Sequence, residues 1–215
     1  FFMKWLAVLL ALTVSVNAAC EGLESTLETQ ICYNNLAVGE DSVRHCFQAP
    51  SDENCIINYA VDKNDATVIT DLSKGEITFY NSEDVDRMLA AYIQSTLDVE
   101  SLEKISSDRL HDAALSLLIG SAYGKTGFAP NEDYCKRIRG GYEYNDVDNH
   151  DVTVEDEINS ARNNCETYVA AIRQLKYGTN ECNKLGDKIS ILYGYELELA
   201  RENCLELVDY IKEGL

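Results

Sequence analysis

The sequence has few basic residues and lacks the short motifs by which many enzymes are recognised. Lysine and arginine number 18 against 37 acidic residues, which gives a formal net charge of −19. Phosphate binding needs a basic face, so this balance argues against nucleic acid as a partner. Gly-x-Ser-x-Gly, His-Glu-x-x-His, phosphate-binding glycine loops and Cys-x-x-Cys are all missing. We therefore expect a non-enzymatic protein without a cofactor.

Long apolar segments are also missing beyond the first residues of the chain. Lys4 precedes an apolar run over 5–16, which is too short to span a bilayer core of about 30 Å comfortably. Small residues follow this run, a pattern that predicts a signal peptide over 1–18. Lipidation of Cys20 is the rival interpretation, but it would leave an odd number of cysteines. We expect a secreted, extracellular protein with no membrane span.

All eight cysteines lie in the predicted mature chain. An even number after a signal peptide predicts four disulfides, although the sequence does not reveal their pairing. Metal binding is the weaker alternative, because no two cysteines have the spacing Cys-x2-Cys or Cys-x4-Cys. The cysteine spacings differ between the two halves, which leaves only a decayed internal repeat open. The predicted disulfide cysteines are Cys20, Cys32, Cys46, Cys55, Cys135, Cys165, Cys182 and Cys204.

Apolar residues recur at helical spacing along most of the mature chain. This pattern predicts an all-α, mainly helical, disulfide-rich secreted domain, a single one over 19–215. A loop is expected from Pro50 to Cys55. The helix that begins at Ser82 and the next one, up to Tyr123, are expected to pack as an antiparallel hairpin. Helices are predicted over 20–36, 42–47, 82–97, 107–123, 153–177 and 182–211.

Residues 67–80 depart from the helical pattern. Two runs of β-favouring residues, 67–70 and 76–80, flank a turn that contains Gly75. Two strands alone are barely stable. The segment is therefore either a small β-hairpin or an ordered extended loop.

The stretch from Cys182 to Ile211 carries a long apolar seam and predicts the central helix, with the 153–177 helix as its antiparallel neighbour. Glu196 falls among apolar residues there, where a carboxylate rarely lies without a partner. Glu196 lies at the edge of an element, or pairs with a buried tyrosine or arginine, or is a polar group in a ligand cavity. Tyrosines, 13 in the chain, suit such cavities because each has an apolar ring with a polar tip. The candidate ligand-binding residues are Glu196, Tyr193, Leu192 and Tyr195.

An acidic loop precedes the 153–177 helix. Asp146, Asp148 and Glu157 occupy positions 1, 3 and 12 of an EF-hand-like loop, which suits calcium. Position 6 is Asp151, however, where an EF-hand has glycine. A solvated acidic loop is the main interpretation, and weak calcium binding is the alternative.

Two functions of different class are consistent with these features. The first is a secreted carrier that binds a small hydrophobic ligand between its helices, as indicated by the apolar seam and Glu196. The second is an extracellular protein-interaction or effector protein that uses the acidic surface loop from Glu143 to Glu157.

Overall fold

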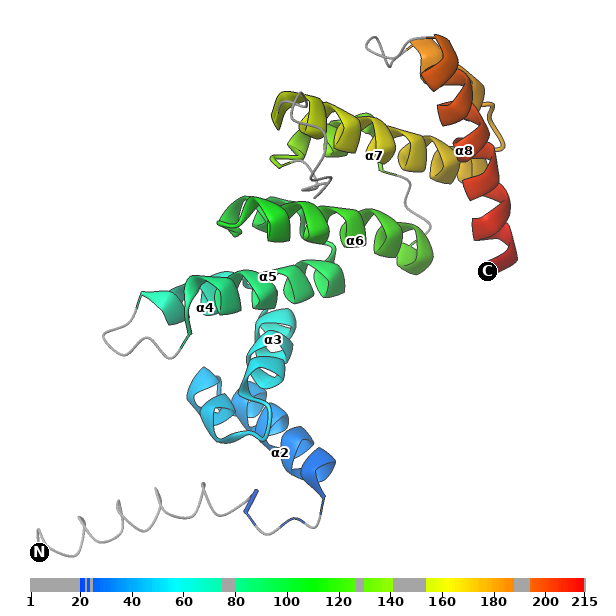
Figure 1. The fold of residues 1–215 in the computed structure, drawn as a ribbon. Coiled ribbons are helices and arrows are strands. Elements are labelled where there is room, and N and C mark those ends of the chain that lie inside the picture. Colours follow the sequence, from blue (N-terminus) through cyan, green and yellow to red (C-terminus); the bar gives the residue numbers. More distant parts are fainter. Residues whose placement is uncertain are drawn as a thin grey trace, which may run out of the picture. The chain divides into compact units, whose positions relative to one another are not determined.

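The computed structural model describes residues 20–21, 23, 25–74, 80–126, 130–140, 154–187 and 194–214. Side chains within these ranges are not described at 122–123, 125–126, 132, 154, 156–157, 186–187, 194–197 and 214. The described residues form α-helices and short 3-10 helices, and none of them lies in a strand (Figure 1). The predicted all-α class is therefore confirmed. The predicted signal peptide, 1–18, lies outside the described residues.

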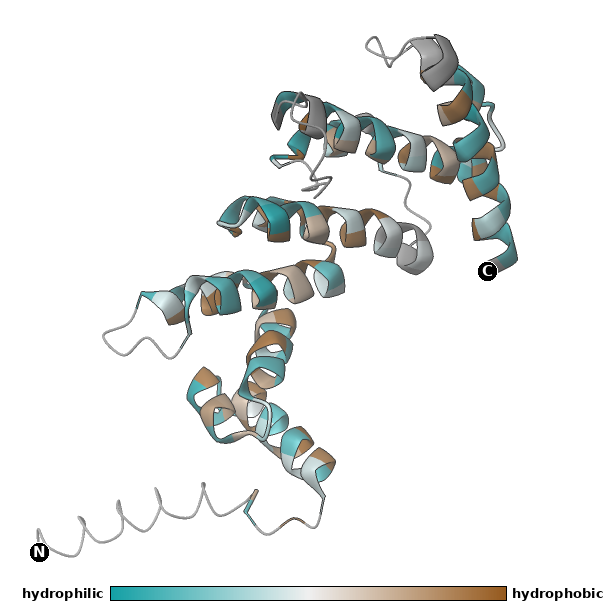
Figure 2. Ribbon diagram, in the orientation of Figure 1, coloured by the Kyte–Doolittle hydropathy of each residue, from teal (hydrophilic) through white to brown (hydrophobic). Residues whose placement is uncertain are grey.

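The chain divides into two compact units, Phe1–Asn81 and Ser82–Leu215. Unit 1 contains α2 (Thr26–Gly39), η1 (Val43–Gln48), α3 (Asp52–Lys63), α4 (Thr67–Thr70) and η2 (Asp71–Ser73). Unit 2 contains α5 (Ser82–Thr96), η3 (Val99–Lys104), α6 (Asp108–Thr126), η4 (Glu132–Arg137), α7 (Val154–Tyr177), η5 (Cys182–Asp187) and α8 (Gly194–Gly214). Figure 2 shows polar and apolar residues interleaved along these helices. No helix in the described part of the chain is long and apolar enough to cross a membrane.

The first predicted helix is present as α2, but it starts later than expected. Ser25 caps its N-terminus, where the serine Oγ accepts a hydrogen bond from the backbone N–H of Glu28 at 3.0 Å. The apolar series Leu23, Leu27 and Ile31 is 41, 69 and 48% exposed. The four-residue spacing thus predicted the helix correctly, although these residues do not form its buried side.

The loop expected from Pro50 to Cys55 is wrong, because α3 begins at Asp52. Asp52 and Glu53 place negative charge in the first turn, which stabilises a helix N-terminus. The Gln30 side chain holds this start against α2: it donates to the Ser51 carbonyl at 3.0 Å and accepts from the Ser51 N–H at 2.8 Å.

The β-hairpin predicted near 67–80 is also wrong. Residues 67–73 are helical as α4 and η2, and 75–79 lie outside the described residues. Asp65 Oδ1 starts α4 by accepting from the N–H and the hydroxyl of Thr67 at 2.8 and 2.7 Å. Ile69 is fully buried one turn later. Local capping and burial therefore outweigh the β-propensity of this run.

Four of the connecting 3-10 helices have the same length and bury the same position. Each of η1, η3, η4 and η5 is six residues long, and its fourth residue is buried. In η1, η3 and η4 the carbonyl of that residue accepts a hydrogen bond from the backbone N–H three residues later. The four connectors therefore share their length and the position of their buried residue, which is cysteine in two of them and leucine in the other two. The buried fourth residues are Cys46, Leu102, Cys135 and Leu185.

All eight cysteines form the four predicted disulfides, and none is free. Each disulfide joins a residue that precedes a helix to a residue within that helix. Three of the four start in a 3-10 connector. Each disulfide thus fixes the segment that leads into a helix against that helix. The pairs are Cys20–Cys32, Cys46–Cys55, Cys135–Cys165 and Cys182–Cys204.

The helices α5 and α6 occupy the residue ranges that the apolar periodicity predicted. Their predicted arrangement as an antiparallel hairpin is wrong. Asp86, in the second turn of α5, accepts from the N–H of Ser106 at 3.0 Å, the N–H of Ser107 at 2.8 Å and the Ser106 hydroxyl at 2.7 Å. These serines stand just before α6, so both helices begin at the same end of the pair. The connector η3 therefore carries the chain back along α5 to this end. Figure 1 shows α5 and α6 lying side by side.

The single central helix predicted over 182–211 is wrong in its first part, which is the 3-10 helix η5. An unbroken helix would separate Cys182 and Cys204 by about 33 Å. Their Cα atoms are 5.5 Å apart. The disulfide therefore places the segment after α7 beside the middle of α8 and not beside its start. For this reason α8 is not a simple antiparallel return along α7. Gly178 ends α7 with φ +63°, as predicted.

Candidate functional site

A groove of about 650 Å³ lies between α7 and α8 in unit 2. This volume falls within the range of small-molecule sites, about 300 to 1,000 Å³. Five lining residues come from α7 and six from α8. They are Ser160, Asn163, Asn164, Thr167, Tyr168, Leu199, Ala200, Asn203, Glu206, Leu207 and Tyr210.

Helical spacing explains why these residues share one face. On each helix the lining positions recur at steps of three and four residues, which places them one above another along the groove. An adjacent side of α8 belongs to the core, where Cys204 and Val208 pack with Ala170 and Ala171 of α7. Leu207 belongs to both surfaces, because it lines the groove and packs against this cluster.

Two disulfides hold the walls of the groove. Cys165 is the neighbour of the lining residue Asn164 and is bonded to Cys135 of η4. Cys204 is the neighbour of Asn203 and is bonded to Cys182 of η5. A site on helices that are fixed in this way keeps its shape before a ligand arrives, which reduces the ordering cost of binding.

The chemistry of the lining is mixed. Leu199, Ala200 and Leu207 supply apolar surface, and the rings of Tyr168 and Tyr210 add aromatic surface with polar tips. Thr167 is buried, and its hydroxyl is satisfied by donation to the Asn163 carbonyl at 2.9 Å.

Amides form the second part of the lining. Asn163, Asn164 and Asn203 each offer two donors and an acceptor. Such a surface suits a molecule with an apolar body and a few polar groups.

The predicted ligand-binding residues lie next to this groove in the sequence, but they are not described within it. Leu192 and Tyr193 fall outside the described residues, and the side chains of Tyr195 and Glu196 are not described. The backbone of Glu196 lies in the first turn of α8, one turn before Leu199 and Ala200. The predicted ligand-binding residues therefore remain predictions.

The calcium candidates are not described either. Asp146 and Asp148 lie outside the described residues, and Glu157 lies in α7 with no described side chain. Among the described side chains, no group of three or more His, Cys, Asp or Glu is arranged to hold a metal ion.

Sequence reasoning missed the asparagines of the groove. Their signal is faint: Asn163-Asn164 and Asn203 are uncharged polar positions in helices otherwise rich in charge, each adjacent to a buried or half-buried cysteine. The predicted contact between the two helices does not by itself show which of their polar positions face a groove.

In comparisons with known proteins, the chain matches no family model, no curated protein and no solved structure.

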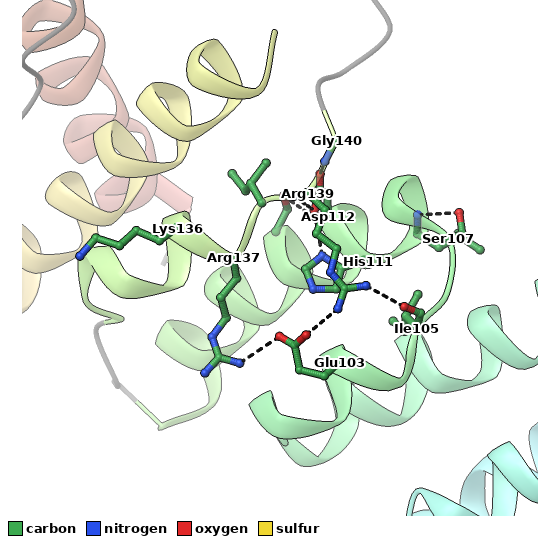
Figure 3. A network of polar contacts seen from close by, with 12 residues as sticks. Glu103, Ile105, Ser107, His111, Asp112, Lys136, Arg137, Arg139 and Gly140 are labelled. Carbon is green, nitrogen blue, oxygen red and sulfur yellow. Dashed lines mark hydrogen bonds and ion pairs between the residues drawn. The ribbon is translucent and has the colours of Figure 1, made fainter. Parts of the chain in front are cut away.

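A second polar cluster surrounds the N-terminal part of α6 (Figure 3). The buried carboxylate of Asp112 accepts from the N–H of Arg139 at 3.1 Å and of Gly140 at 2.9 Å, and its Oδ1 lies 2.9 Å from Nδ1 of His111. Burial raises the pKa of Asp112, but the hydrogen bonds from His111, Arg139 and Gly140 outweigh it, so the pKa lies below the ordinary 3.8. The carboxylate is therefore ionised, and His111 Nδ1 is the donor.

Arg139 extends this cluster to η3. Its guanidinium donates to the Ile105 carbonyl at 2.9 Å and to Glu103 Oε2 at 2.6 Å. The hydrogen bond from Arg139 holds the pKa of Glu103 below its ordinary 4.5. These contacts tie the segment after η4 to α6 and η3.

His111 and Asp112 form a His–Asp pair, but the imidazole ring of His111 is not accessible to solvent. Its ring is fully buried, and its Nε2 makes no hydrogen bond with a described residue. A general base must come within hydrogen-bond reach of the proton it removes. The contacts of the cluster join α6 to η3 and to the segment after η4, so we expect it to stabilise unit 2.

Proposed function

We propose that this protein is a secreted, non-enzymatic binding protein that carries a small, mainly apolar molecule in the α7/α8 groove. The observation that carries the proposal is the groove itself: about 650 Å³, with apolar walls and amides, between two disulfide-held helices. Four disulfides are typical of a protein that works in an oxidising compartment.

The composition of the lining limits the ligand class. A groove lined by leucine, alanine and tyrosine excludes water from an aliphatic or ring-containing body. The asparagines would receive hydroxyl, amine or carbonyl groups of that molecule. The alternative function, a protein interaction through the acidic loop from Glu143 to Glu157, stays a prediction because 141–153 lie outside the described residues.

The proposal is tested by a binding screen on the intact, disulfide-bonded protein. Long-chain alcohols, sterols and terpenoid alcohols are offered in native mass spectrometry and thermal-shift measurements. We expect a one-to-one complex and a raised unfolding temperature for at least one class, because binding to the folded state alone stabilises it.

A matched pair of variants locates the site. Ala200→Trp fills the groove, and Leu205→Trp adds an indole to an exposed position of the same helix that does not line it. We expect the first variant to lose binding and the second to keep it. Equal binding by both variants, or no complex with any class, would overturn the proposal.

A further inference from the structure

The described lining of the α7/α8 groove carries charge of only one sign. Among the described lining residues Glu206 is the single charged one, and none is a lysine, arginine or histidine. Glu206 is exposed and makes no hydrogen bond or ion pair with another described residue. A carboxylate that is not paired with a described residue of the groove can pair with a cation supplied by a ligand.

Three basic residues of α7 and α8 contact groups outside the groove. Arg162 of α7 donates to the Ile138 carbonyl at 3.1 Å, and Arg173 lies 3.9 Å from Glu181. Lys212 pairs with Asp209 at 3.5 Å, and none of these cations lines the groove.

The surroundings of Glu206 strengthen the negative field. Glu202 lies one turn before Glu206 on α8 and is exposed, so its carboxylate adds to the negative field at Glu206. A ligand carboxylate would meet this field and the net charge of the chain, −19, as repulsion. The groove therefore disfavours fatty acids relative to neutral or cationic molecules of the same size.

The other lining groups suit an ammonium head. The rings of Tyr168 and Tyr210 can present their faces to a cation. The amide oxygens of Asn163, Asn164 and Asn203 can accept from the ammonium hydrogens that Glu206 does not bind. Leu199 and Leu207 provide the apolar surface for the rest of such a molecule.

We infer that the groove selects an amphipathic organic cation, an amine with an apolar chain or ring system whose ammonium group pairs with Glu206. The inference rests on the proposed function, since it names the ligand class of the same groove.

The test is a matched series on the intact protein: dodecylamine, dodecanol and dodecanoate, which share one chain and differ in head-group charge. Affinities are measured by isothermal titration calorimetry at neutral pH. We expect the amine to bind most tightly and the carboxylate most weakly. The advantage of the amine should shrink as salt is added, because partly exposed charges are screened.

Variants separate the charge from the groove. Glu206→Gln should weaken dodecylamine roughly two- to fivefold, the size expected for a partly exposed ion pair, and leave dodecanol unchanged. Glu202→Gln, one turn away and outside the lining, is the control and should have a smaller effect. Ala200→Trp should abolish binding of all three compounds.

The outcomes are distinguishable. Equal affinity for amine and alcohol, or no effect of Glu206→Gln, would overturn the inference and leave the proposed function standing. Amine binding that survives Ala200→Trp would show attraction to the acidic surface alone and also overturn it. Failure of all three compounds to bind, together with failure of the neutral ligands in the screen above, would overturn both.

Discussion

The Cα atoms of Cys182 and Cys204 lie 5.5 Å apart, and the disulfide between these residues fixes η5 against the middle of α8. Around it pack Ala170, Ala171 and Val208, so one cluster holds α7 and α8 together beneath the groove. The staple therefore supports both the stability of unit 2 and the shape of the groove.

Replacing both cysteines, Cys182→Ala with Cys204→Ala, should lower the free energy of unfolding by about 3 kcal/mol, because the bond closes a loop in the unfolded chain. Ligand binding should weaken as well. The pair Cys46→Ala with Cys55→Ala, in unit 1, is the control and should lower stability without affecting the groove. Urea unfolding and the binding assay measure the two effects; equal loss of binding in both double variants would contradict this role.

Asp86→Ala should lower the free energy of unfolding by roughly 2 to 4 kcal/mol. The buried carboxylate accepts three hydrogen bonds from Ser106 and Ser107, and its removal leaves two backbone N–H groups and a hydroxyl without that partner. Asp84→Ala, on the same helix, removes an ion pair to the exposed Arg87 and should cost less than about 1 kcal/mol. Similar unfolding midpoints for the two variants in urea would show that Asp86 does not hold the start of α6.

Leu102 tests the repeated connector. It is the fully buried fourth residue of η3 and takes the place that cysteine has in η1 and η4. Leu102→Ala should lower the free energy of unfolding by about 2 to 5 kcal/mol, the usual cost of truncating a buried leucine. Leu117→Ala in α6 is the control because Leu117 is 49% exposed, and it should cost less than about 1 kcal/mol. Chemical denaturation followed by circular dichroism distinguishes them, and equal losses would contradict the assignment.

Unit 2 should lose stability at acid pH. The pKa values of Asp112 and Glu103 are depressed in the folded state, so their contribution is present above the unfolded values of about 4 and is lost as pH falls through the folded values. Asp112→Asn should lower stability by about 1 to 3 kcal/mol at neutral pH and lose less than the wild type on acidification. Asp209→Asn, at an exposed position, should keep the wild-type acid response. Urea unfolding across the acid range checks this, and parallel curves for Asp112→Asn and wild type would contradict it.

Hydrophobic periodicity was sufficient to predict most of the long helices. The run that begins at Ser82 and the one that ends at Tyr177 are amphipathic. Both form helices in the structure, in agreement with their apolar spacing. Residues 67–70 show the opposite case: β-branched side chains favour a strand locally, yet burial of Ile69 and the turn at Asp65 select a helix.

The disulfide pairing and the directions of the helices could not be predicted from the sequence. Apolar residues in η5 continue the periodicity of α8, so Cys182 could not be separated from the helix without the knowledge that it bonds to Cys204. Asn163 and Asn203 look like ordinary solvated positions in the sequence, and the structure shows that they line one groove where α7 packs against α8. The three hydrogen bonds of Asp86 likewise show the direction of α6, which helical spacing alone does not encode.

The central claim, that the α7/α8 groove is the ligand site, is tested most directly by nuclear magnetic resonance of the isotopically labelled, disulfide-bonded protein titrated with the tightest ligand of the screen. Backbone amide shifts should change along 160–168 and 199–210, with the largest changes near Asn203 and Glu206, and unit 1 should remain unaffected. Shifts confined to unit 1, or spread evenly over the acidic surface, would contradict the account.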